Sequence, residues 1–221
     1  MGSGPDAPIT IAHRAGNDLQ GLRKAVAAGV DFVEADIRWD GGPVARHERR
    51  LPFLPVYWDR WHVRWDARPS LALTVLLDLV KGAARPYLDI KAQDRRAPAA
   101  ILEALRTRDA LSKVVISSQY WPALEAMRAA APELRLFRSV GDPSQLEALR
   151  RLLENDPLHP AGIAIDRELL TPELAATLRQ RGLDVHAWGV RELADARRLL
   201  DWGATGIIAD DLDLLRALKA S

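Results

Sequence analysis

The sequence predicts an α/β protein of the (β/α)8 class, a TIM barrel, from the alternation of its apolar patterns. Short apolar runs typical of β-strands recur along the 221 residues, and most are followed by a segment whose apolar residues have helical spacing. Strand–helix units joined by short connections give parallel strands, and eight such units close on themselves into a barrel. The chain is short for this fold but within its range.

The expected strands are short runs rich in β-branched and other apolar residues. They lie at about residues 9–13, 31–37, 43–47, 85–91, 113–117, 134–139, 161–165, 183–188 and 205–209. The run at 43–47 follows Gly41-Gly42 so closely that we expect a hairpin appended after the second strand. The remaining eight runs supply the barrel.

The expected helices carry apolar residues three or four positions apart. They lie at 18–28, 97–108, 120–131, 143–154, 191–202 and 211–219, with a further helix opening at Thr171. Asp142 before Pro143 gives a helix start, in which a cap is followed by proline at the first helical position. Gly29 and Gly182 provide helix ends.

A doubly wound open sheet is the rival architecture. It requires a glycine-rich phosphate turn after the first strand, and the segment His13–Asn17 does not match one. No linker or low-complexity stretch interrupts the alternation, so residues 9–221 are expected to form a single domain. Residues 1–8 are small and polar and are expected to be a flexible leader.

Composition excludes several classes of protein. A net charge of +1 argues against a nucleic-acid binder, whose surface would be strongly basic. The absence of cysteine excludes disulfides, thiolate catalysis and cysteine-ligated zinc. No apolar run approaches the ~20 residues that cross a bilayer. We therefore expect a soluble cytoplasmic protein, and the sequence leaves its oligomeric state open.

Three carboxylates fall where expected strands end. Because side chains alternate along a strand, Glu34 and Asp36 share one face, and Asp89 shares a face with Lys91. Barrel enzymes build their active sites at the carboxyl ends of the strands. Three carboxylates gathered there would repel one another unless a cation binds, and oxygen ligands favour one divalent Mg²⁺ or Ca²⁺.

Two histidines and two cations accompany these acids. His13 and His47 each end a strand, and imidazoles suit the two proton transfers that cleavage of a phosphodiester requires. Arg14 can contact phosphate oxygens or hold a neighbouring carboxylate, and Lys91 can stabilise an oxyanion. Trp188 ends the seventh strand and is expected to line the pocket. A small-molecule phosphodiester is the expected ligand.

Each of these groups also has a structural interpretation. A histidine at a strand end is more often structural, an acid pair can cap a helix, and Asp89 with Lys91 can be an ordinary ion pair. Their joint occurrence in this order favours function. Ser117 and Gln119, after the fourth strand, are candidate polar contacts. The remaining histidines lack such a context and are interpreted as structural: His62, His159 and His186.

Residues 51–69 are the most aromatic stretch and are expected to form a small insertion after the second strand. Trp58, Trp61 and Trp65 have helical spacing, which favours one packed face. The alternative is a lid or wall for the alcohol part of a substrate, with the arginines of this stretch available for phosphate.

The order of these motifs resembles that of the glycerophosphodiester phosphodiesterase family over about residues 9–214. The resemblance implies a TIM barrel that binds one divalent cation and splits glycerophosphodiesters into glycerol 3-phosphate and an alcohol. It implies that Glu34, Asp36 and Asp89 are metal ligands, and that His13 and His47 are the acid/base pair. The matching motifs are His13-Arg14, Glu34-Ala35-Asp36, His47-Glu48, Asp89-Ile90-Lys91, Trp188-Gly189-Val190 and Gly206-Ile207-Ile208-Ala209-Asp210.

The chain departs from the family pattern at three positions. Gly16 stands before Asn17 where the family has glutamate, Asp89 replaces a glutamate, and Glu48 replaces an aspartate. The aspartate before the lysine is also similar to the sphingomyelinase D-type phospholipases, which form cyclic phosphates but typically depend on disulfides. A cyclic-phosphate-forming enzyme and a catalytically silent phosphate-binding barrel therefore remain alternatives.

Overall fold

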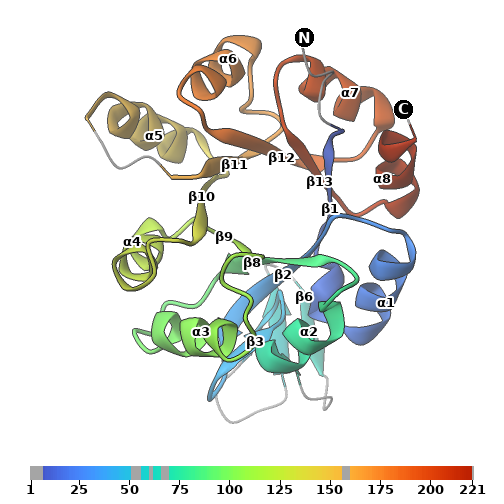
Figure 1. Cartoon of the computed structure of the whole chain (residues 1–221), viewed down its shortest axis with the longest axis vertical. Helices are drawn as coiled ribbons and strands as arrows, with labels where there is room; N and C mark the ends of the chain where they lie inside the picture. Colours follow the sequence, from blue (N-terminus) through green and yellow to red (C-terminus); the bar gives the residue numbers. More distant parts are fainter. Residues whose placement is uncertain (1–6, 51–55, 60–61, 66–69, 156–159, 221) are drawn as a thin grey trace.

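The computed structural model of the chain describes residues 7–50, 56–59, 62–65, 70–155 and 160–220. Eight parallel strands form a closed barrel, and a helix follows each strand and packs outside it (Figure 1). The first strand pairs with both the last and the second, which closes the ring. The predicted TIM barrel is confirmed. The barrel strands are β1 (Ile9–Ala12), β2 (Phe32–Trp39), β8 (Arg85–Ile90), β9 (Val115–Ser118), β10 (Arg135–Val140), β11 (Gly162–Asp166), β12 (Asp184–Val190) and β13 (Gly206–Ala209).

The helices lie close to the predicted segments. They are α1 (Leu19–Ala27), α2 (Leu73–Val80), α3 (Ala97–Arg106), α4 (Trp121–Ala130), α5 (Pro143–Asn155), α6 (Pro172–Gln180), α7 (Leu193–Asp201) and α8 (Leu212–Lys219). Asp18 caps α1 by accepting from the backbone N–H groups of residues 20 and 21, and Thr171 caps α6 in the same way from Leu174. Among the described residues, no helix combines the length and apolar character needed to span a bilayer.

Helix α2 is the one helix that the sequence analysis did not name. Its sequence, LTVLLDLV, is apolar at most positions and so gives no clear helical stripe. The structure buries Leu73, Leu76, Leu77 and Val80 against the barrel and leaves the other side towards solvent. A short, mostly apolar run fits a buried strand as well as a helix, and only its packing decides between them.

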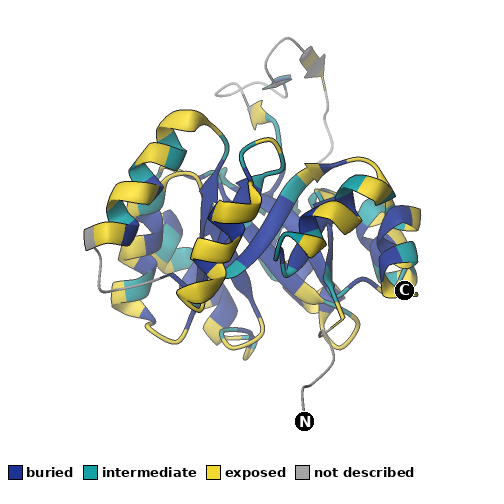
Figure 2. Cartoon of the chain, turned by 90° about the horizontal axis from the view of Figure 1, so that it is seen from above, coloured by how far each residue is buried: buried dark blue, intermediate teal, exposed yellow. Residues whose placement is uncertain are grey.

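The apolar core has two parts, separated by the strands. Outward-facing residues such as Ile37, Leu88 and Ile90 pack under the helices. Figure 2 shows the barrel strands as mostly buried. The inside of the barrel is filled mainly by a smaller set of side chains: Ile11, Phe32, Tyr87, Val115, Phe137 and Ile208. His186 lies among them with no exposed surface, stacked 4.5 Å from the ring of Phe137, in keeping with its structural interpretation.

A two-part insertion separates β2 from α2. The expected hairpin is present: β3 (Pro43–Ala45) pairs antiparallel with β2 and with β7 (Leu71–Ala72). A separate antiparallel sheet contains β4 (Arg49–Arg50), β5 (Val56–Asp59) and β6 (His62–Trp65). In Figure 2 the described strands of the insertion rise at the top of the barrel.

The prediction that the tryptophans of this insertion form one packed helical face is wrong. Trp58 and Trp65 lie on antiparallel strands, and Trp65 is 68% exposed. Trp58 and Trp65 do share one face of this small sheet, but the segment is not helical and that face is open to solvent at Trp65. Trp61, His159 and the side chain of His62 lie outside the part of the chain that the structure describes.

Candidate active site

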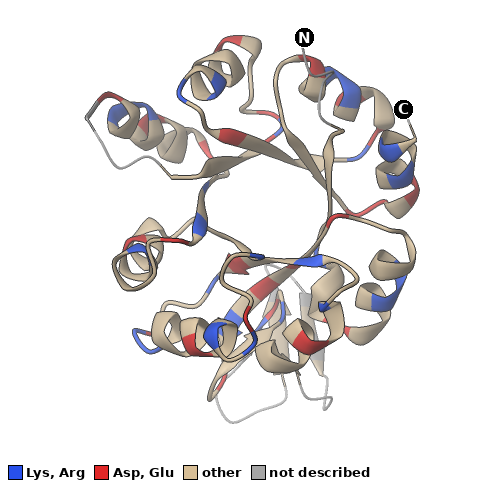
Figure 3. Cartoon of the chain, in the orientation of Figure 1, with Lys and Arg blue, Asp and Glu red and all other residues tan. Residues whose placement is uncertain are grey.

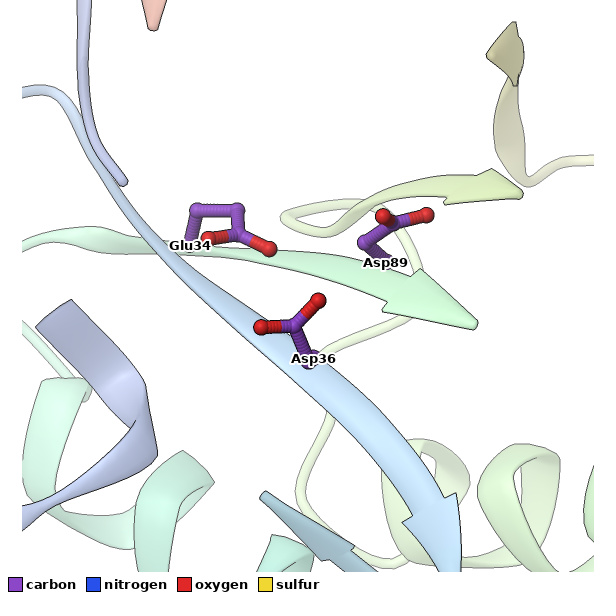
Figure 4. A group of neighbouring side chains, drawn as sticks. All are labelled: Glu34, Asp36 and Asp89. Atoms are coloured by element: carbon purple, nitrogen blue, oxygen red, sulfur yellow. The ribbon is translucent and has the colours of Figure 1, made fainter. Parts of the chain in front are cut away.

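Three carboxylates meet at the carboxyl ends of two neighbouring strands. Glu34 and Asp36 project from β2, and Asp89 projects from β8 directly opposite Asp36 in the strand register. Figure 4 shows all three side chains turned into the same space. One oxygen from each carboxylate lies within 4.8 Å of the other two, and Glu34 and Asp36 are buried. The grouping predicted from strand alternation is present.

The charges of this cluster are unbalanced. Burial raises the pKa of Glu34 well above its usual value, and the charges of Asp36 and Asp89 raise it further. Burial also raises the pKa of Asp36, but Lys91 and the amide of Asn17 outweigh that effect and hold it below its usual value. Figure 3 shows the acidic and basic positions side by side on β2 and β8. Lys91 and Arg14 both contact the cluster, and two positive charges do not balance three carboxylates, so this donor set fits a hard divalent cation.

Neighbouring polar groups orient two of the carboxylates. Asn17 donates to Asp36 Oδ2 at 2.8 Å and accepts from the Asp36 backbone N–H at 2.9 Å. Ser117 Oγ donates to Asp89 Oδ1 at 3.0 Å, while Lys91 Nζ lies 2.5 Å from Asp89 Oδ2. Lys91 also lies 3.6 Å from Asp36 Oδ1, so it joins the carboxylates of both strands. These contacts hold the carboxylates of Asp36 and Asp89 in orientations in which they face each other and Glu34.

His13 is held by the last strand of the barrel. Its backbone N–H donates to the carbonyl of Ala209 at 2.9 Å, and its side-chain Nδ1 lies 2.9 Å from Asp210 Oδ1. A carboxylate at Nδ1 fixes the orientation of an imidazole, and the hydrogen bond to His13 holds the pKa of the Asp210 carboxyl below its usual value. The contact with Asp210 does not involve the other ring nitrogen, Nε2.

His47 follows the hairpin strand β3 and is contacted by Arg14. The Arg14 Nη2 atom lies 2.6 Å from His47 Nε2. Arginine can only donate, so Nε2 of His47 accepts in this contact and the ring proton is on Nδ1. Arg14 itself has φ of 53°, a left-handed conformation that is uncommon outside glycine. This turn aims its backbone N–H at the Glu34 carboxylate, which accepts that hydrogen bond.

All these groups surround one cavity of about 670 Å³ at the catalytic end of the barrel. Every predicted site residue lines it: His13, Arg14, Glu34, Asp36, His47, Asp89, Lys91 and Trp188. The candidate contacts Ser117 and Gln119 line it as well. Sequence reasoning did not place Arg38, Arg49 or Ser139 there. Trp58 also lines the cavity, in keeping with a wall formed by the insertion rather than a core position.

Two supporting residues were also missed as partners. Asp210 was noted only as the end of a motif, and Asn17 only as a matching residue. The contact between His13 and Asp210 spans 197 positions in sequence and exists only because the barrel closes. No local spacing could have indicated it.

Comparison with known proteins places the chain in a family. Residues 83–214 match the model of the glycerophosphoryl diester phosphodiesterase family. The chain belongs to this family. A glycerophosphodiester phosphodiesterase of Bacillus subtilis is 23% identical over 97% of the chain and 87% of its own length. The resemblance found in the sequence is confirmed, and the protein is an enzyme of the phosphodiesterase class.

Solved structures share the fold of this family member. A Silicibacter pomeroyi structure described as a glycerophosphoryl diester phosphodiesterase superposes with a TM-score of 0.81 at 21% identity, covering 99% of this chain and 95% of that one. An Oleispira antarctica phosphodiesterase in complex with the product sn-glycerol-3-phosphate gives a TM-score of 0.78 at 19% identity, covering 97% and 98%. At sequence identities this low, the structural similarity shows only that these proteins share the barrel fold.

Proposed function

We propose that the chain hydrolyses glycerophosphodiesters to glycerol 3-phosphate and an alcohol, with one divalent cation and with His13 and His47 as proton-transfer groups. The observation that carries the proposal is one cavity in which three clustered carboxylates face two histidines, in a chain of this family. The relative from Oleispira antarctica, whose structure is in complex with sn-glycerol-3-phosphate, supports the identity of the product.

Glu34, Asp36 and Asp89 would hold the cation, either Mg²⁺ or Ca²⁺. When bound, such an ion acts as a Lewis acid on a phosphoryl oxygen. Arg14 and Lys91 supply fixed positive charge for the other phosphoryl oxygens, on which negative charge builds during the reaction. Trp188 lines the cavity and excludes water from one side of the ligand.

We infer different roles for the two histidines from their contacts. His47, which accepts a hydrogen bond at Nε2, is the general base that takes a proton from the attacking water. Arg14 occupies that nitrogen, but an anionic phosphate is a stronger acceptor for a guanidinium than a neutral imidazole and draws it away. As the water oxygen bonds to phosphorus, the bond to the alcohol oxygen breaks. His13, whose Nδ1 is held by Asp210, donates a proton from its other ring nitrogen to the leaving alkoxide.

Product analysis by phosphorus NMR tests the reaction. A panel of glycerophosphodiesters with different alcohols is incubated with the enzyme, with and without EDTA. We expect glycerol 3-phosphate, and we expect its release to stop with EDTA and resume with Mg²⁺ or Ca²⁺. A cyclic phosphate product would contradict hydrolysis and would indicate that a hydroxyl of the substrate, not water, attacks the phosphorus. Silence on every diester with cation present would contradict the proposal in favour of a binding barrel.

Histidine variants test the two roles. His13→Ala and His47→Ala should each lower kcat by roughly 100- to 10,000-fold, the usual contribution of an acid–base group. A diester with a p-nitrophenyl leaving group needs no proton donor, so it should restore most of the rate of His13→Ala but not that of His47→Ala. Circular dichroism and thermal unfolding check that both variants fold. Near-wild-type turnover in both would refute the mechanism, and the opposite pattern of rescue would reverse the roles.

A further inference from the structure

One face of the β4–β5–β6 sheet carries exposed apolar residues next to the cavity. Trp58 lies opposite Val63 in the strand register, and Val56 lies opposite Trp65, so the four side chains share a face. Val63 is 74% exposed and Trp65 is 68% exposed. Trp58, on the same face, lines the active-site cavity. We call Val63 and Trp65, together with Trp58, the insertion face.

Other exposed apolar residues lie at the same end of the barrel. Among the described residues, six large apolar side chains are exposed: Leu19, Val63, Trp65, Val75, Leu79 and Tyr120. Leu19 begins α1 just beyond the carboxyl end of β1, and Tyr120 follows β9 directly. Both therefore belong to the rim that surrounds the cavity. Four of the six lie at the catalytic end, and the remaining two lie on α2.

The insertion also carries a small excess of positive charge. Residues 40–72 contain six arginines against four acidic residues, a net charge of +2, whereas the whole chain has a net charge of +1. The Arg49 guanidinium lies 5.2 Å from the ring centre of Trp58, so charge and aromatic surface meet at the cavity. Three of the seven tryptophans of the chain lie in this segment. Tryptophan and arginine together are typical of surfaces that lie at the boundary between lipid headgroups and acyl chains.

We propose that the insertion face docks on an anionic phospholipid surface and holds the mouth of the active-site cavity towards it. A stable protein interface buries roughly 800 Å² on each partner. One exposed tryptophan and one exposed valine offer far less than that, whereas a membrane surface needs only a few inserted side chains and nearby positive charge. The inference rests on exposure, charge and position, and it is independent of the diesterase reaction.

Vesicle sedimentation tests the proposal with the whole chain. Large unilamellar vesicles of phosphatidylcholine alone are compared with vesicles that contain about one-third phosphatidylglycerol. We expect the wild type to sediment with the anionic vesicles, less with the neutral ones, and less as salt screens the arginines. The double variant Val63→Ser/Trp65→Ser should partition at least about 10-fold more weakly, because the apolar side chains no longer insert.

The double variant Val75→Ser/Leu79→Ser is the matched control, since it removes two exposed apolar side chains from α2 and should partition as the wild type does. Turnover of a water-soluble glycerophosphodiester reports folding, and it should be unchanged in both double variants. Failure of the wild type to sediment with anionic vesicles would overturn the proposal, as would equal partitioning of the two double variants. Sedimentation with vesicles but no turnover would count against the proposed reaction alone.

Discussion

At the level of single residues, Asp89 is a candidate metal ligand whose two carboxylate oxygens are both held by neighbouring side chains. Lys91 and Ser117 contact different oxygens of its carboxylate, at 2.5 and 3.0 Å. The family resemblance places a glutamate at this position, which reaches one methylene further. With two neighbours fixing its rotamer, the shorter aspartate still brings an oxygen within 4.8 Å of those of Glu34 and Asp36. Ser117 would therefore act on a bound cation through Asp89.

Replacing Ser117 should weaken cation binding directly. Ser117→Ala removes the hydrogen bond that orients Asp89, and loss of such a supporting contact typically costs about 10- to 100-fold in metal affinity. Titration calorimetry with Mg²⁺ and with Ca²⁺ measures this without reference to turnover. The neighbouring variant Ser118→Ala is the control, because Ser118 Oγ donates to the carbonyl of Ile90 on the far side of the strand. Equal affinities for the two variants would contradict the role of Ser117.

Asp210 should matter for the rate rather than for folding. Its side chain is 81% exposed and accepts from His13, so Asp210→Asn removes the negative charge beside the imidazole with little loss of packing. We expect kcat to fall by roughly 10- to 100-fold, with KM and the unfolding temperature nearly unchanged. Asp213→Asn, an equally conservative change at a carboxylate that is 87% exposed, is the control. If a substrate with a p-nitrophenyl leaving group restores the rate of Asp210→Asn, the variant is defective in donating a proton to the leaving group.

The sequence predicted which residues form the site but not how they support one another. Strand alternation places Glu34 and Asp36 on one face without any structure, because the period of two is a property of the strand itself. The partnership of His13 with Asp210 depends instead on the first and last barrel strands becoming neighbours. Contacts of that kind follow from closure of the whole barrel and leave no periodic signal.

At the level of elements, regular barrel segments were predictable and the insertion was not. The strands and most helices of the barrel follow periodic patterns with clear caps, as with Thr171 before α6. Helix α2 lacks a polar stripe, and the tryptophans of the insertion happen to have helical spacing although the residues form strands. In both segments tertiary packing decides the secondary structure, so local periodicity misleads.

Strand β11 shows how one residue can fix the packing of an element. A Cβ on Gly162 would lie 2.3 Å from the Phe137 ring and 2.6 Å from the Asp184 carbonyl oxygen, a backbone atom that cannot easily move. Gly162→Ala should therefore lower the free energy of unfolding by about 1–3 kcal/mol, the usual cost of overpacking a core. Urea denaturation measures the loss. Gly42→Ala, where the added Cβ meets no atom within 4 Å, should show no comparable loss.

At the level of the whole molecule, the interior of the barrel divides into two halves along its axis. The ionisable groups and the cavity lie towards the carboxyl ends of the strands, and an aromatic layer with Tyr87 and Phe137 lies beneath them. Below that layer, Arg85 and Arg135 lie against the rings of Phe32 and Phe137. His186 sits within this stack, and its Nε2 has no hydrogen-bond partner among the described residues. A charged imidazole is therefore strongly disfavoured there.

This arrangement predicts a stability that declines with acidification. Burial, helped by Arg135 and Arg85, lowers the pKa of His186 to about 3, from 6.5 in an unfolded chain. Between these values the unfolded state binds the proton and the folded state does not, so stability is full above pH 6.5 and falls as the pH drops towards 3. From pH 7 to pH 5 this single group should cost about 2 kcal/mol.

The variant His186→Phe isolates that contribution, because it keeps an aromatic ring on Phe137 and removes the titrating nitrogen atoms. The added ring volume can shift stability at pH 7, so the quantity compared is the change in unfolding free energy between pH 7 and pH 5, measured by urea denaturation. Carboxylates that titrate in this range contribute equally to both proteins and cancel. We expect the wild type to lose about 2 kcal/mol more than the variant. Equal losses would mean that the folded protein accommodates a protonated His186, for example by opening the aromatic layer to water, and that the two halves of the interior are not separated as the structure indicates.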